Sequence, residues 1–157
     1  MREILFRGKR LDNGEWVYGS FCMDAREQFN GLCGVDGFIR LYDKAKGKMQ
    51  TYEVDRETVG QYTGLNDKNV MKIWEGDIIK MDNGKSSSIA VVKFGEYYPK
   101  MFYLMMDICF PIAQHINANG FFAESTKHED MILFKSPFIE VIGNIHDNKL
   151  EDFDNGR

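Results

Sequence analysis

Alternating apolar and polar side chains along the first third of the chain predict β-hairpins. Four such runs flank two groups of turn formers: Ile4–Arg7 and Trp16–Met23 around Asp12-Asn13-Gly14, and Phe38–Tyr42 and Met49–Val54 around Lys46-Gly47. A period of two places one face of a strand against a core, and a glycine in a short polar link allows a tight reversal. The sequence therefore predicts two hairpins within residues 1–56.

The β pattern continues after these hairpins and is interrupted by two turns. A run of β-branched and aromatic residues, Val59–Thr63, is followed by turn formers in Gly64–Asn69 and by the apolar pair Ile73-Trp74. The Asp77 carboxylate can then accept hydrogen bonds from neighbouring main-chain N–H groups. We expect a strand, a turn and a strand, with Asp77 capping the turn before the next strand.

The second half keeps the β pattern except for one stretch with helical spacing. Apolar residues recur every three or four positions at Met101, Leu104, Met105, Ile108, Ile112 and Ile116. This period predicts one inserted helix over residues 99–117. The segments on either side of it predict further strands: Asp77–Met81, Ile89–Phe94, Phe121–Ser125, Met131–Phe134 and Phe138–Ile145.

Three parts of the chain together resemble one family signature. They are Ile4–Trp16, the middle pieces Glu57–Leu65, Asp67–Asn69 and Glu75–Ile79, and Glu140–Asn148 near the end. The pattern is similar to that of the YopX family, small proteins encoded mostly by bacteriophages and prophages. The resemblance implies a mainly β fold with an SH3-like barrel in its second half, no established activity and no catalytic residues.

The chain departs from this family pattern at two places. Val70 stands where a glycine more often follows Asp-Lys-Asn, so the turn there is expected to be built differently. Residues 97–119 look like an insertion relative to shorter members. The motif positions that we single out are Glu57, Val59, Gly60, Gln61, Thr63, Gly64, Leu65, Glu75, Gly76, Asp77, Gly143 and Asn144.

The resemblance and the length of the chain lead us to expect a single YopX-like domain of residues 1–157, divided into two lobes. The first lobe is the pair of N-terminal hairpins, residues 1–56. The second is the SH3-like barrel of residues 57–148 with its helical insertion, and residues 149–157 form a polar tail with little to bury.

Composition restricts the classes of protein to consider. The 157 residues are 43% hydrophobic, which is typical of globular domains, and no apolar run approaches the roughly 20 residues needed to cross a bilayer. Residues 1–7 lack the apolar core of a secretory signal. Cys22, Cys33 and Cys109 have no metal-binding spacing. We expect reduced thiols, no cofactor and a location in the cytoplasm of the host bacterium.

A basic cluster at the N-terminus is the candidate nucleic-acid-binding site. It consists of Arg2, Arg7, Lys9 and Arg10, with Trp16 as a stacking surface. Basic side chains beside aromatic rings can hold single strands of nucleic acid. The net charge of −4 weighs against strong attraction to phosphates, and edge hairpins often carry charge to prevent aggregation. We favour the second explanation.

The sequence contains no recognisable catalytic or metal-binding set. The conceivable metal ligands are His115, His128 and His146 with Asp107, Glu129 and Asp130, and none has the spacing of a known site. Glu75 and Asp77 could form a pair of carboxylates, although a turn-and-cap role explains them better. We predict no catalytic residues and no metal, and an enzyme is the least supported function.

A protein-binding role is the function that we favour. The apolar residues of Met101–Ile116 could form a docking surface, but we favour a helix that packs them against a sheet as core. This helix is apolar on more than one side, and the excess apolar face indicates self-association. From residue 121 onward there are eight acidic and four basic side chains, so the net charge lies in the last quarter. The hypothesis is an accessory protein that binds a host or phage protein, and nucleic-acid binding is the alternative.

Overall fold

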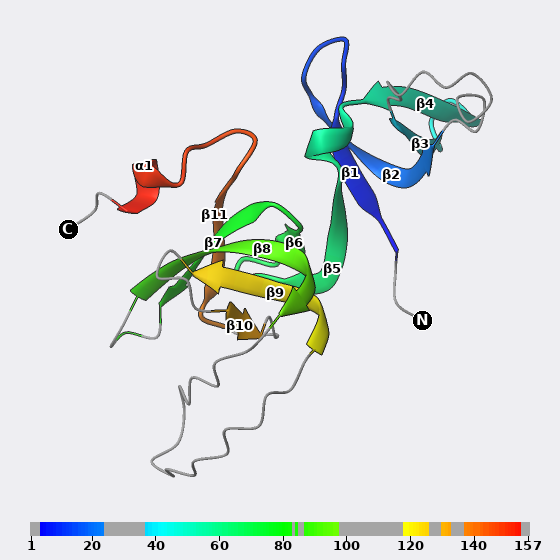
Figure 1. Cartoon of the computed structure of the whole chain (residues 1–157). Helices are drawn as coiled ribbons and strands as arrows, with labels where there is room; N and C mark the ends of the chain where they lie inside the picture. Colours follow the sequence, from blue (N-terminus) through cyan, green and yellow to red (C-terminus); the bar gives the residue numbers. More distant parts are fainter. Residues whose placement is uncertain are drawn as a thin grey trace. The chain divides into compact units, whose positions relative to one another are not determined.

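The computed structural model describes residues 4–23, 37–82, 84, 87–97, 118–125, 130–132 and 137–154 (Figure 1). The chain forms two compact units, Met1–Gly64 and Leu65–Arg157. In the described part, the fold is mainly β, with two antiparallel sheets and almost no helix. The predicted helix over residues 99–117 lies outside the described residues.

The first unit contains the two predicted hairpins, and both are confirmed. Its elements are β1 (Phe6–Lys9), β2 (Trp16–Met23), β3 (Gly37–Asp43), β4 (Lys48–Val54), the 3-10 helix η2 (Arg56–Thr58) and the start of β5 (Gly60–Asn66). The β1–β2 register runs from Phe6↔Gly19 to Lys9↔Trp16, and the β3–β4 register from Gly37↔Val54 to Asp43↔Lys48. These pairings fix which side chains share a face.

Strand β2 joins the two hairpins into one curved sheet. Its first half pairs with β1, and its second half pairs with β3 from Ser20↔Arg40 to Met23↔Gly37. The sheet is curved, and Arg10, which directly follows β1, forms a single bridge with Val54 at the end of β4. Ile39 and Val54 are fully buried inside this curve and form the centre of its core.

The second unit is built around a five-stranded sheet with the order β10-β9-β8-β7-β11. Its elements are β6 (Lys72–Trp74), β7 (Asp77–Asp82), β8 (Ser87–Tyr97), β9 (Ala118–Ser125), β10 (Asp130–Ile132), β11 (Ile139–Asn144) and the short α1 (Glu151–Asp154). The long strands β8 and β9 lie side by side over eight residue pairs (Figure 1). One buried apolar cluster of this unit contains Ile73, Ile79, Ala90, Val92, Ala123 and Ile139.

Strand β5 carries the chain from one unit into the other. It pairs with β1 through Phe6↔Gln61 and Arg7↔Gly60, and the other sheet has the order β4-β3-β2-β1-β5-β6. Residues 57–64, expected to open the second lobe, therefore pair with the first unit. Neither sheet is closed in the described residues, so the SH3-like barrel of residues 57–148 stays a prediction.

Candidate functional site

The basic N-terminal cluster is engaged by its own hairpin. Lys9 pairs with Trp16 and Arg7 with Tyr18, so all four side chains share one face of the sheet. The Arg7 guanidinium lies 4.6 Å from the centre of the Trp16 ring, and the Lys9 ammonium lies 5.5 Å from it. Arg7 is only 7% exposed. The Trp16 ring is thus in contact with two cations of its own chain.

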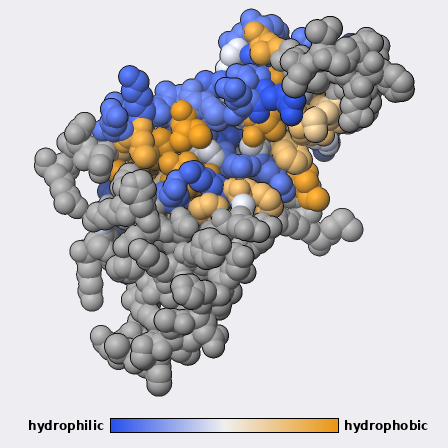
Figure 2. All heavy atoms as spheres, in the orientation of Figure 1, coloured by the Kyte–Doolittle hydropathy of each residue, from blue (hydrophilic) through white to orange (hydrophobic). Residues whose placement is uncertain are grey.

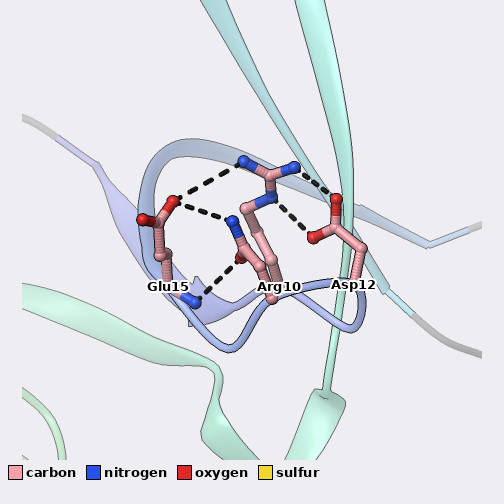
Figure 3. A network of polar contacts seen from close by, with 4 residues as sticks. Arg10, Asp12 and Glu15 are labelled. Atoms are coloured by element: carbon pink, nitrogen blue, oxygen red, sulfur yellow. Dashed lines mark hydrogen bonds and ion pairs between the residues drawn. The ribbon is translucent and has the colours of Figure 1, made fainter.

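Arg10 is held by the turn that follows β1, as Figure 3 shows. Its Nε donates a hydrogen bond to Asp12 Oδ1 at 2.8 Å, its second terminal nitrogen binds Asp12 Oδ2, and Glu15 Oε2 lies 3.8 Å from the other. The hydrogen bond to Asp12 raises the pKa of Arg10 and lowers the pKa of Asp12. Arg10 also stacks on Tyr52 at 4.5 Å.

These contacts occupy several of the side chains that the sequence analysis assigned to nucleic-acid binding. The structure brings Arg7, Lys9 and Trp16 together, whereas Arg10 is neutralised by two carboxylates, and Arg2 lies outside the described residues. Attraction to nucleic acid depends on cations that can displace counterions from phosphates. The arrangement stabilises the hairpin, and binding of nucleic acid stays a prediction.

Several exposed apolar side chains of the first unit lie together on the solvent side of β2, β3 and β4. Tyr42 pairs directly with Met49, and these two side chains are 58% and 56% exposed. Arg40 pairs with Thr51 on one side and with Ser20 on the other, and all three are exposed. We call this surface the outer face, formed by Tyr18, Ser20, Arg40, Tyr42, Met49 and Thr51.

The outer face was not among the sites predicted from the sequence. The sequence feature that could have indicated this face is the alternation of side chains in β3, where Ile39 is fully buried and Arg40 and Tyr42 are exposed. The hairpin register is needed to place Met49 beside Tyr42. Figure 2 shows hydrophobic atoms at the surface among hydrophilic ones, so exposed apolar side chains occur within a mixed surface.

The motif residues of the second unit meet at a buried polar pair. Asp77 is 1% exposed; its Oδ2 accepts a hydrogen bond from the Trp74 N–H at 2.8 Å, and its Oδ1 accepts one from Asn144 Nδ2 at 3.2 Å. The first bond is the capping role predicted for Asp77. The second ties the turn before β7 to the end of β11, 67 residues further along the chain.

Two motif glycines allow this close packing. Gly76 has a φ of 80°, and its carbonyl accepts a hydrogen bond from the Ile145 N–H at 3.0 Å. A Cβ added to Gly143 would lie 2.6 Å from Asn148 Oδ1 and 2.9 Å from Phe153 Cζ. The tail, expected to have little to bury, therefore packs its Phe153 ring against the main chain at Gly143.

A second buried carboxylate, Asp67, organises the turn after β5. Its Oδ1 accepts from the N–H groups of Asn69 and Met71, both at 2.8 Å, and its Oδ2 accepts from Val141 N–H at 3.1 Å. Val70 lies within this turn with a φ of 65° and is 76% exposed. The chain thus keeps a glycine-like turn while carrying a β-branched residue there, which strains the main chain.

An ion pair lies beside the Asp67 turn. Lys68 Nζ lies 2.6 Å from Glu140 Oε2, and the Lys68 N–H donates to the Ile139 carbonyl at 2.8 Å. The hydrogen bond from Lys68 lowers the pKa of Glu140. The ion pair therefore persists until the pH falls below the ordinary range of a glutamate.

The first part of the motif caps the 3-10 helix and lines β5. Asp55 Oδ1 accepts from the Glu57 N–H at 3.0 Å, and Thr58 Oγ1 accepts from the Lys9 N–H at 2.8 Å. The other motif residues of this part follow directly: Val59 ends η2, and Gly60, Gln61, Thr63, Gly64 and Leu65 lie in β5. These residues connect the helical turn to β1.

Comparison with known families gives a match over most of the chain. The model of the family described as YopX protein matches residues 5–151. The chain belongs to the YopX family. No curated protein matches it. In this YopX chain the motif positions Gly76, Asp77, Gly143 and Asn144 hold the second unit together.

Most of the conceivable metal ligands lie in segments that the structure does not describe. His115, His128, Asp107 and Glu129 lie outside the described residues, and Asp130 opens β10. His146 follows Asn144, whose Oδ1 accepts a hydrogen bond from the His146 N–H at 2.9 Å. Among the described residues, no three His, Cys, Asp or Glu side chains form a cluster that could hold a metal.

No helix within the described part of the chain is long and apolar enough to cross a bilayer.

Proposed function

We propose that the chain is a non-enzymatic protein-binding module whose docking surface is the outer face of the first unit. The observation that carries this proposal is the exposed Tyr42–Met49 pair beside Tyr18 and Arg40. Tyrosine, methionine and arginine are enriched at protein interfaces because they supply contact area together with polar groups. The polar Ser20 and Thr51 lie beside them on the same face.

The wider setting of this proposal rests on the family. We place the module in an accessory protein of a bacteriophage or prophage that acts in the cytoplasm of the host bacterium. The second unit serves as its scaffold and completes an SH3-like barrel. We do not propose nucleic-acid binding as a second function, because Arg7, Lys9 and Arg10 already contact groups of their own unit.

A matched pair of methionine variants tests the docking surface. Met49→Thr removes an apolar side chain from the outer face, and Met71→Thr removes one that is 62% exposed in the second unit. Threonine keeps the strand propensity at position 49 and introduces a hydroxyl. The purified wild type and both variants are used to capture proteins from a nuclease-treated bacterial lysate.

We expect Met49→Thr, alone or with Tyr42→Thr, to lose a stoichiometric protein that wild type and Met71→Thr both retain. Loss of a buried anchor at an interface commonly costs about 1–2 kcal/mol, or roughly five- to thirtyfold in affinity. Equal retention by all variants would contradict the proposal. Retention only in samples without nuclease would point to nucleic acid instead.

A further inference from the structure

The edge of β4 bounds the outer face, and β4 is the terminal strand in the sheet order. Within the part of the chain that the structure describes, only the end of this edge is covered, where Arg10 bridges Val54 and the Leu11 N–H donates to the Glu53 carbonyl at 3.1 Å. Among the described residues, no main-chain hydrogen bond reaches this edge between Lys48 and Tyr52.

The direction of the free main-chain groups follows from the bond at Glu53. In an antiparallel strand, alternate residues direct their N–H and C=O groups to the same neighbour. Because the Glu53 carbonyl faces Leu11, the groups of Thr51 and Met49 also face the open edge. These two residues thus present main-chain groups at the edge and exposed side chains on the outer face.

The β3–β4 hairpin carries more basic than acidic side chains. The β3–β4 hairpin, residues 37–54, carries Arg40, Lys44, Lys46 and Lys48 against Asp43 and Glu53, within a chain of net charge −4. Lys46 is paired with Asp43 at 3.5 Å. In the described part of the chain, Arg40, Lys44 and Lys48 have no carboxylate partner.

We infer that the free edge of β4 takes up an extended acidic peptide segment of a partner protein as an additional antiparallel strand. The peptide main chain bonds to Met49 and Thr51, its apolar side chains contact Tyr42 and Met49, and its carboxylates face Lys44 and Lys48. Strand addition supplies affinity through the main chain and specificity through alternate side chains. This inference rests on the proposed docking role of the outer face and adds the class of ligand and the mode of binding.

Position 51 offers a substitution that acts on the edge alone. Thr51→Pro removes the N–H that faces the edge, and it spares the bonds from β4 to β3 because that N–H points away from β3. Proline is tolerated on edge strands in this orientation. Thr51→Val is the matched control, since it keeps the N–H and the shape of the side chain. Thermal unfolding monitored by circular dichroism establishes that both variants fold.

The probes are two pools of fluorescent decapeptides that alternate random Val, Thr, Tyr or Phe with either glutamate or lysine. Binding is measured by fluorescence anisotropy. We expect the glutamate pool to bind wild type and Thr51→Val, and to bind Thr51→Pro about tenfold more weakly. The charge-reversed Lys44→Glu/Lys48→Glu variant should also lose about tenfold at low salt, whereas Lys149→Glu in the second unit should not. If Thr51→Pro fails to fold, the comparison of Lys44→Glu/Lys48→Glu with Lys149→Glu tests the proposed binding of the acidic peptide.

The outcomes separate this inference from the proposed function. Equal binding by Thr51→Pro and Thr51→Val, together with loss of binding in Met49→Thr, overturns strand addition and leaves the docking surface standing. Binding that survives Met49→Thr and Thr51→Pro alike overturns both. Equal binding of the two pools, or of neither, overturns the acidic ligand, as does displacement of the glutamate pool by single-stranded oligothymidylate.

Discussion

The buried carboxylates of the second unit contrast with the exposed side chains on the outer face of the first unit. In the second unit, Asp67, Asp77 and Asn144 are buried and bond to main-chain or amide groups that would otherwise lack partners. In the first unit, Arg40, Tyr42 and Thr51 point away from the core on the outer face. The predicted motif positions of the second unit therefore contribute to its scaffold, and the surface that we propose for a partner lies outside the predicted motif.

Charge separates the units as well. The first unit has ten basic and ten acidic side chains, while the second has ten basic and fourteen acidic ones, so the net charge of −4 belongs to the second. The acidic excess that the sequence placed in the last quarter is part of this larger difference. A partner with an acidic peptide would be repelled by the second unit and accepted by the β3–β4 hairpin of the first.

The largest expected effect on stability comes from the buried carboxylate. Asp77→Ala should lower the free energy of unfolding by about 3 kcal/mol, because it leaves the Trp74 N–H and the Asn144 amide without their acceptor in a buried site. Urea denaturation measures the change. Asp82→Ala, which removes an exposed carboxylate from the same strand, is the control and should cost under about 1 kcal/mol. Similar losses in both variants would remove the distinction between scaffold and surface.

A smaller effect of opposite sign is expected at Val70. Val70→Gly should raise the free energy of unfolding by about 1 kcal/mol, since glycine adopts a φ of 65° without steric cost. Part of the gain is offset by the greater freedom of glycine in the unfolded chain. Val70→Ala keeps a Cβ and should gain less. A loss of stability in Val70→Gly would mean that the exposed valine contributes contacts that outweigh the strain.

The smallest effect is expected on the outer face. Met49→Thr should change the free energy of unfolding by no more than about 0.5 kcal/mol, because the side chain is mostly exposed and threonine suits a strand. Calorimetry on the purified variant measures this. A loss above roughly 2 kcal/mol would place Met49 in the core and remove the basis of the contrast between the units.

The hairpins and turns could be predicted from the sequence, because the residues that form them are close together along the chain. The hairpin of β3 and β4 follows from alternation and from Gly47, which has a φ of 64° in the reversal. The capping role of Asp77 is local too, because its partner Trp74 is three residues away. Contacts of this kind join residues that are close in the sequence, so a short stretch of the sequence is enough to predict them.

The contacts between residues that are far apart in the sequence could not be predicted. Asp67 bonds to Val141 and Asp77 to Asn144, partners 74 and 67 residues away, and no spacing rule connects them. The outer face needed the register between strands, which places Tyr42 opposite Met49. At Val70 the sequence indicated a departure from the family, and only the main-chain geometry showed that valine adopts the conformation of the missing glycine.

The bond between Asp77 and Asn144 also has a consequence for the order of events during synthesis. The first unit can complete its pairings once residue 64 has left the ribosome, whereas the second must wait for Asn144, 80 residues later. At translation rates of about 5–20 residues per second, this interval lasts roughly 4–16 s. Throughout it, β7 and β8 can pair while Ile79 lacks the cover of β11, so the nascent chain presents an apolar hairpin to chaperones before the motif is complete.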